Sequence, residues 1–305
     1  MDRPHITVLG AVTALLAGLL TVGASPGTAS GAERPRTEVA TSPAARTDAA
    51  EDRVTDYWTS KRMRTAEAAD TQSASGASQA SVPRGKPTTV AAVAAASVTS
   101  TTGKVFFTLG GSNYVCSGAA TSSGNRDVVT TAGHCVNEGP GAFATNWAFV
   151  PAYNNGSRPY GTWTARTLVT TSAWANLGDI NYDGGFAVMN TLNASHLTDV
   201  VGGQGIAFNL ARGLSYSAYG YPAAPPFTGE TLQSCSGTAS DDTYGGTQSQ
   251  GIPCNMTGGS SGGPWLTDGS INSVNSFGYT GVPNRMFGPY FGSQIQSAYT
   301  SAASA

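Results

Sequence analysis

The chain has 305 residues, of which 40% are hydrophobic, so it is long enough for one large domain or two small ones with a sizeable core. From residue 105 onward it carries five arginines, no lysine and nine acidic residues, a formal balance of −4. A region of this charge has no basic surface for nucleic acid and no polybasic face for anionic lipid, so we expect neither partner.

Residues 1–32 have the pattern of a secretory signal peptide. Arg3 lies in a short N-terminal region, an apolar run of 17 residues covers 6–22, and small residues continue to Ala32. The alternative is a retained membrane anchor, but the run is short for a membrane span and contains both glycine and threonine. We therefore expect a secreted, extracellular protein that has no stable membrane association once the signal is removed.

Residues 33–97 differ in composition from the rest of the chain. They are rich in Ala, Ser, Thr, Arg, Glu and Asp, and Tyr57 and Trp58 are their only aromatic residues. Such a segment cannot bury a core of its own. We expect a largely disordered pro-region or linker with at most a weak helix over 52–69.

The remainder has the pattern of an all-β domain. Short apolar or alternating runs are separated by turn signals rich in Gly, Asn and Pro, as in a sandwich or barrel. The expected strands cover residues 104–109, 128–131, 147–150, 164–169, 186–189 and 214–219. Near the C-terminus a short helix is predicted, with Ser293 as its N-cap and Ile295, Ala298 and Tyr299 on one face.

Two motifs carry the candidate chemistry. In Thr257 to Trp265, glycines on both sides of Ser261 allow backbone amides to converge beside its hydroxyl, as an oxyanion hole requires. A serine hydroxyl also needs a base, and after residue 32 the chain offers only His134 and His196. His196 lies in a polar loop, where we expect a solvated surface histidine. His134 is followed directly by Cys135, where a disulfide would hold it, so His134 is the expected base.

Together, Thr-Ala-Gly-His-Cys at 131–135 and Gly-Ser-Ser-Gly-Gly-Pro at 259–264 resemble the signatures of the chymotrypsin-like serine peptidases, nearest to the bacterial trypsin-like and glutamyl-endopeptidase branches. The resemblance covers roughly residues 104–299. It implies two packed antiparallel β-barrels with a short C-terminal helix, in a peptidase domain over 98–305 whose second barrel starts at about 201. It also implies a serine endopeptidase that cleaves protein or peptide substrates through an acyl-enzyme, without a metal or other cofactor.

The base also needs a carboxylate to orient it, and the stretch 178–188 offers two, Asp179 and Asp183. This stretch also resembles the opening of an EF-hand calcium loop, but position 12 would be Asn190 instead of Glu. Asp183 is favoured because it precedes the apolar strand 186–189, as the triad aspartate does in the resembled family, and Asp179 stays open. The order His134, Asp183, Ser261 excludes the α/β-hydrolase elbow, since no histidine follows the serine.

The resemblance assigns further roles. It implies oxyanion-hole N–H groups at Gly259 and Ser261, and a substrate-binding edge strand at Ser276, Phe277 and Gly278, with Asn255 near the floor of the specificity pocket. It also implies a disulfide between Cys116 and Cys135, and then one between Cys235 and Cys254. The neutral Asn255 and Asn275 leave the trypsin-like and glutamyl specificities both open.

One departure concerns activation. Ser260 stands where vertebrate members have an aspartate that binds the new N-terminal ammonium. A neutral hydroxyl cannot balance a buried ammonium. We therefore expect local hydrogen bonds and the Cys235–Cys254 disulfide to order the stretch 257–263 that contains Gly259 and Ser261, called the oxyanion loop below. Residues 33–97 are expected to act as a folding aid or removable cover.

Two alternatives to an active peptidase stay open. They are a catalytically inactive, peptide-binding homologue and an esterase of the same fold. The sequence does not indicate an oligomeric state.

Overall fold

The computed structural model describes residues 38–69, the backbone of 94–95, and 99–305. The expected signal peptide at 1–32 therefore lies outside the described residues. So does residue 98, where the peptidase domain is expected to begin, whereas the domain is described from residue 99 onward.

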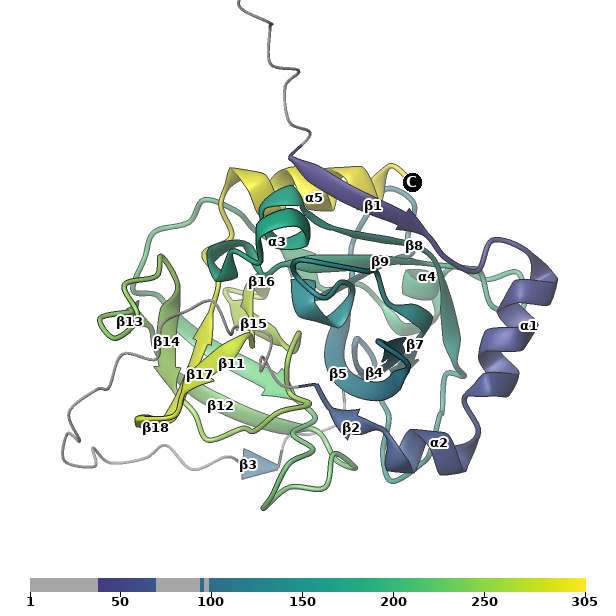
Figure 1. Ribbon diagram of the computed structural model, residues 1–305, viewed down its shortest axis with the longest axis horizontal. Coiled ribbons are helices and arrows are strands. Elements are labelled where there is room, and N and C mark those ends of the chain that lie inside the picture. Colours follow the sequence, from purple (N-terminus) through teal and green to yellow (C-terminus); the bar gives the residue numbers. More distant parts are fainter. Residues whose placement is uncertain (1–37, 70–93, 96–98) are drawn as a thin grey trace, which may run out of the picture. The chain divides into compact units, whose positions relative to one another are not determined.

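Six strands close into an antiparallel barrel (Figure 1). In ring order they are β4 (Thr102–Leu109), β5 (Ser112–Thr121), β6 (Val128–Thr131), β9 (Gly185–Met189), β8 (Trp163–Thr171) and β7 (Thr145–Pro151), and β7 pairs with β4. Val105, Phe107 and Phe186 are among the side chains that fill the core. Because alternate residues of each strand face this core, the expected strands in this half are confirmed to within two residues at each end.

The second half consists of two further sheets. One contains β10 (Gly205–Ile206), β16 (Ser270–Val274), β15 (Pro264–Thr267), β11 (Ser215–Gly220), β12 (Gln233–Thr238) and β3 (Ala94–Ala95). The other contains β13 (Ser240–Asp241), β14 (Gln250–Pro253), β18 (Val282–Gly288) and β17 (Phe277–Tyr279). Their shared core includes Tyr216, Ile252 and Trp265 beside the Cys235–Cys254 disulfide. The mostly β architecture is thus confirmed.

Short helices cover the sheets, and none of those in the described residues is long and apolar enough to cross a membrane. The C-terminal helix α5 (Ser293–Ala303) packs on β8 and β9 (Figure 1). It buries Ile295, Ala298 and Ala302 in the first core, whereas Tyr299 is half-buried. The helix is therefore as expected, except that Gly292, and not Ser293, is its N-cap. The others in this part of the chain are α3 (Ser172–Leu177) and α4 (Leu197–Val201).

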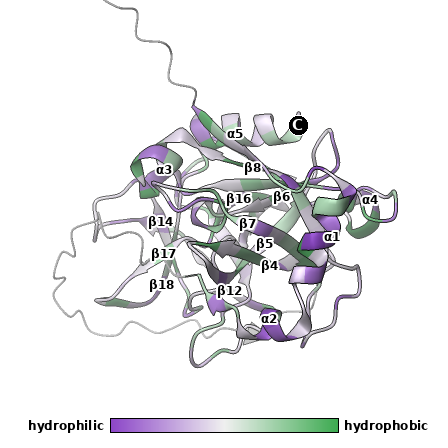
Figure 2. Ribbon diagram, turned by 45° about the vertical axis from the view of Figure 1, so that its right-hand side comes forward, coloured by the Kyte–Doolittle hydropathy of each residue, from purple (hydrophilic) through white to green (hydrophobic). Residues whose placement is uncertain are grey.

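The N-terminal segment 38–69 departs from the expectation of disorder. It forms β1 (Val39–Pro43), α1 (Asp48–Tyr57), α2 (Ser60–Thr65) and β2 (Glu67–Ala68). Figure 2 shows hydrophilic turns along both helices, yet Val54, Trp58 and Met63 are buried in one cluster with Phe106 and other barrel residues. The segment has too few apolar side chains for its own core, but it shares one with the outer face of the barrel.

Candidate active site

The pairing of β6 with β9 brings a histidine and an aspartate together. Thr131 at the end of β6 lies opposite Gly185 at the start of β9, so the 3-10 turn Gly133–Cys135 and Asp183 are neighbours. His134 Nδ1 lies 2.8 Å from Asp183 Oδ2, and the backbone N–H of His134 donates to Oδ1 at 2.8 Å. The Asp183 side chain is fully buried, and the Ser276 hydroxyl also donates to it. Its carboxylate is therefore held from three sides.

Asp179, the other candidate, has a different role. Its Oδ1 accepts from the backbone N–H of Asn181 at 3.1 Å and from the side-chain amide at 2.9 Å. The Asn181 side-chain oxygen in turn accepts from the N–H of Gln248 at 2.6 Å. With Asp183 bound to His134, this loop does not present the set of free oxygens that an EF-hand would need.

The serine loop meets the histidine turn at the Cys116–Cys135 disulfide. The carbonyl of Ser261 accepts from the N–H of Ser117 at 2.7 Å and lies 3.7 Å from Cys135 Sγ. Ser261 and His134 are each 7% exposed, and His134 Nε2 is buried with no hydrogen-bond partner among the described residues. Because catalytic hydrogen bonds are often completed only when substrate binds, an unpartnered Nε2 is compatible with a base that waits for the serine proton.

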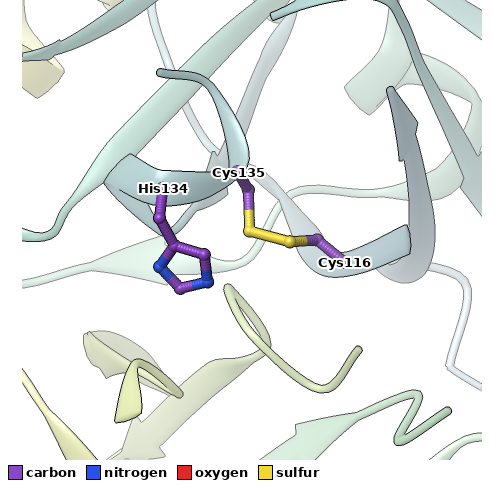
Figure 3. Close-up of side chains that lie close together, drawn as sticks. All are labelled: Cys116, His134 and Cys135. Carbon is purple, nitrogen blue, oxygen red and sulfur yellow. A yellow bond between two sulfur atoms is a disulfide. The ribbon is translucent and has the colours of Figure 1, made fainter. Parts of the chain in front are cut away.

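Figure 3 shows His134 beside Cys116 and Cys135, whose candidate ligand atoms lie within 4.8 Å of one another. The two sulfurs are bonded to each other, so they are not thiolate ligands for a metal. Both implied disulfides, Cys116–Cys135 and Cys235–Cys254, are confirmed, and the described residues contain no free cysteine. The first holds the histidine turn against β5.

The oxyanion loop is ordered by hydrogen bonds. Gly259 has φ +91°, and a Cβ there would lie 2.9 Å from the Tyr221 carbonyl oxygen, so only glycine fits. The carbonyl of Gly258 accepts from the N–H of Ala223 at 2.7 Å, and that of Gly259 accepts from the Ser117 hydroxyl at 2.9 Å. The Ser260 hydroxyl donates to the Thr257 carbonyl at 2.7 Å. None of these bonds involves an α-amino group.

Ser117 was missed from the sequence, because nothing but its position after Cys116 distinguishes it. It is fully buried, and its hydroxyl also accepts from the N–H of Tyr221 at 2.8 Å. It therefore connects strand β5 to the oxyanion loop.

The expected substrate strand lies at a sheet edge. Within the described part of the chain, β17 pairs with β18 alone, and a Cβ at Gly278 would meet only the Arg285 carbonyl, at 3.5 Å. Phe277 is buried, and the N–H of Ser276 donates to the Phe287 carbonyl at 2.9 Å. Asn255 is half-buried, and its Oδ1 has no hydrogen-bond partner among the described residues.

His196 differs from the expectation of a solvated surface histidine. Its side chain is 33% exposed, and its Nδ1 lies 2.9 Å from Oδ2 of the buried Asp127. The sequence interpretation missed this because Asp127 precedes β6, 69 residues away along the chain. The fold supplies the contact.

Comparison with known proteins shows that the chain is similar to proteases of known structure. No family model matches the chain. Among solved structures it is similar to protease Anisep from Arthrobacter nicotinovorans, at 57% identity and a TM-score of 0.68, over 70% of this chain and 100% of that one. It is also similar to the thermostable serine protease AL20 from an extremophilic microorganism, at 50% identity and a TM-score of 0.66, over 68% of this chain and 98% of that one.

Two further similarities are weaker and support narrower conclusions. A Glu endopeptidase structure is 19% identical with a TM-score of 0.56, over 70% of this chain and 97% of that one, and supports the fold alone. An extracellular metalloprotease of Bacillus subtilis is 34% identical over 79 residues, which are 26% of this chain and 24% of that protein. The match thus spans about a quarter of that curated relative.

Proposed function

This chain belongs to the serine proteases of chymotrypsin-like fold, and on that premise we propose that His134, Asp183 and Ser261 form its catalytic triad. The observation that carries the proposal is the buried His134–Asp183 pair, with Nδ1 to Oδ2 at 2.8 Å, next to the disulfide whose Cys135 Sγ lies 3.7 Å from the Ser261 carbonyl oxygen. A carboxylate at Nδ1 favours the tautomer with the proton on Nδ1, which leaves Nε2 as the acceptor. His134 Nε2 has no hydrogen-bond partner among the described residues, so no group of this part of the chain competes for it.

In the proposed reaction Ser261 Oγ attacks the scissile carbonyl while His134 Nε2 takes its proton. The imidazolium that forms is stabilised by Asp183, and it then protonates the leaving amine. Water attacks the resulting acyl-enzyme with His134 again as base, which regenerates Ser261.

We assign the developing oxyanion to the N–H groups of Gly259 and Ser261. Supporting this, the carbonyl of Gly258 is held by Ala223 and that of Gly259 by Ser117, so the peptide planes on both sides of Gly259 are held in place. Preorganised donors of this kind are worth about 100- to 1,000-fold in rate each.

The substrate would be a peptide that adds to β17 through its backbone, along Ser276, Phe277 and Gly278. The unpaired edge of β17 and the unpartnered Oδ1 of Asn255 support this assignment. Cleavage-site profiling on a peptide library would identify the P1 residue, which an amide at the pocket floor leaves open.

The finer architecture and processing are proposed on the same basis. The two sheets of the second half would form the second β-barrel, from about residue 201, and the peptidase domain would begin near residue 98. We also propose export through the signal at 1–32, in line with the extracellular relative.

Labelling with a fluorophosphonate tests the nucleophile in the protein secreted from the full chain. Ser261→Ala should abolish both labelling and peptide hydrolysis, whereas Ser260→Ala, which removes only the hydroxyl bonded to Thr257, should keep most of both. Labelled Ser260 would contradict the triad. Absence of labelling with intact folding would favour an inactive homologue, and turnover of simple esters without peptides would favour an esterase.

A further inference from the structure

The end of the N-terminal segment reaches the proposed oxyanion hole. The Ala69 carbonyl accepts a hydrogen bond from the N–H of Gly259 at 3.2 Å, and the Ala69 N–H donates to the Val115 carbonyl at 3.0 Å. Ala69 is 6% exposed and belongs to the same apolar cluster as Cys116 and Cys135. A carbonyl of the chain itself therefore occupies a donor that the oxyanion would need.

The segment does not approach the site in the way proposed for substrate. β2 pairs in parallel with β5, with Glu67 opposite Tyr114 and Ala68 opposite Val115. It leaves the edge of β17 unpaired. The carbonyl of Ala69 thus reaches Gly259 from the β5 side, without the backbone alignment along β17 that would present a peptide bond for cleavage.

The rest of the segment is anchored over a broad apolar face. Trp58 is 1% exposed and packs on Phe106 at 5.4 Å between ring centroids, and its indole N–H donates to the Asn146 carbonyl. The Tyr57 hydroxyl donates to Asn113 Oδ1 at 2.8 Å. At the other end, β1 pairs with β8 over five residues. Contacts of this extent hold the last residues of the segment in place.

We propose that residues 38–69 are a built-in inhibitor of the protease site. In this state α1 and α2 dock on the barrel, and the Ala69 carbonyl occupies the N–H of Gly259. This inference rests on the proposed function of Gly259 and Ser261. It identifies the partner of the apolar face around Phe106, Ala148 and Val150 as the chain's own N-terminal segment, and it makes release of that segment a step that activation requires.

The rate of fluorophosphonate labelling of the full chain tests the proposal, measured on the uncut band. Ala69→Glu places an unpaired carboxylate at a buried position and should displace the end of the segment. If the docked segment is favoured over the released segment by about 100 to 1, the unmodified chain should be labelled about 100-fold more slowly than this variant. Lys61→Glu places a carboxylate at an exposed position of α2 instead and should label at the unmodified rate.

Ala69→Pro provides a second test that keeps the position apolar. It removes the N–H that donates to Val115, and should also speed labelling while the melting temperature of the domain stays near that of Lys61→Glu. Equal labelling rates in the unmodified chain and both Ala69 variants would overturn the inhibitor and leave the triad intact. Absence of Ser261 labelling in every variant and in the processed protein would overturn the proposed function, and the inference with it.

Discussion

Among the described residues, two His–Asp pairs are almost alike in geometry, although His134 is buried and His196 is 33% exposed. His134 Nδ1 lies 2.8 Å from Asp183, and His196 Nδ1 lies 2.9 Å from Asp127. Each carboxylate also accepts a backbone N–H, from His134 itself at 2.8 Å and from Leu197 at 3.1 Å. The pair by itself therefore does not identify a catalytic site.

The two pairs differ in their other partners. Asp127 is also bonded to Arg166, 3.1 Å away, and Arg166 in turn donates to the carbonyl oxygen of Ala305. At Asp183 the further partner is the neutral hydroxyl of Ser276. A guanidinium balances the charge of Asp127 at all times, whereas the charge of Asp183 stays available to stabilise an imidazolium. The comparison indicates a structural pair in one place and a catalytic pair in the other.

The largest expected difference between the pairs is in their histidines. We predict that His134→Ala lowers kcat by roughly a million-fold, because no base remains for Ser261. His196→Ala should leave kcat close to that of the unmodified enzyme, since Asp127 keeps Arg166 and Leu197 as partners. Steady-state kinetics on a peptide substrate would check both, and a large loss of kcat in a folded His196→Ala protein would break the comparison.

The aspartates come next. Asp183→Asn should lower kcat by about 10,000-fold because the amide favours the wrong tautomer of His134. Asp127→Asn should leave kcat unchanged and lower the free energy of unfolding by about 1 to 3 kcal/mol, through the weakened bonds to Arg166 and His196. Denaturant titration with parallel kinetics separates the two effects. A strong loss of activity in Asp179→Asn would reassign the carboxylate.

The third partner of Asp183, the Ser276 hydroxyl, gives a further test of the difference between the two His–Asp pairs. Ser276→Ala removes the hydroxyl that donates to Asp183, and one bond to a charged group corresponds to about a 10-fold loss of kcat. KM should change less than kcat, because the backbone of Ser276 is retained. A change confined to KM would assign the hydroxyl to substrate binding instead.

The smallest effect is expected at Arg166. Arg166→Met should lower the free energy of unfolding by about 1 kcal/mol, because this guanidinium is partly exposed and its one bond to Ala305 lies at the surface. The loss should be visible as faster hydrogen exchange in α5, with no change in kcat. Unchanged exchange in α5 would show that Arg166 does not help to hold the helix.

Sequence patterns were sufficient for the elements whose chemistry is local. Short apolar or alternating runs between turn signals predicted β4, β6, β7, β8, β9 and β11 to within two residues at each end, because the residues of these strands are mostly buried against nearby partners. The glycines around Ser261 and the Cys135 beside His134 marked the two candidate loops, since turn geometry and disulfide bonding restrict which residues fit.

Only the tertiary structure decided which carboxylate meets His134. Asp179 and Asp183 are four positions apart, and it is the register of Thr131 on Gly185 that brings the second to the histidine. The same holds for Asp127 with His196, for the hydroxyl of Ser117 in the oxyanion loop, and for the docking of residues 38–69. Each of these contacts joins residues at least 69 positions apart, or a segment with too little apolar surface of its own, so no local pattern in the chain encodes it.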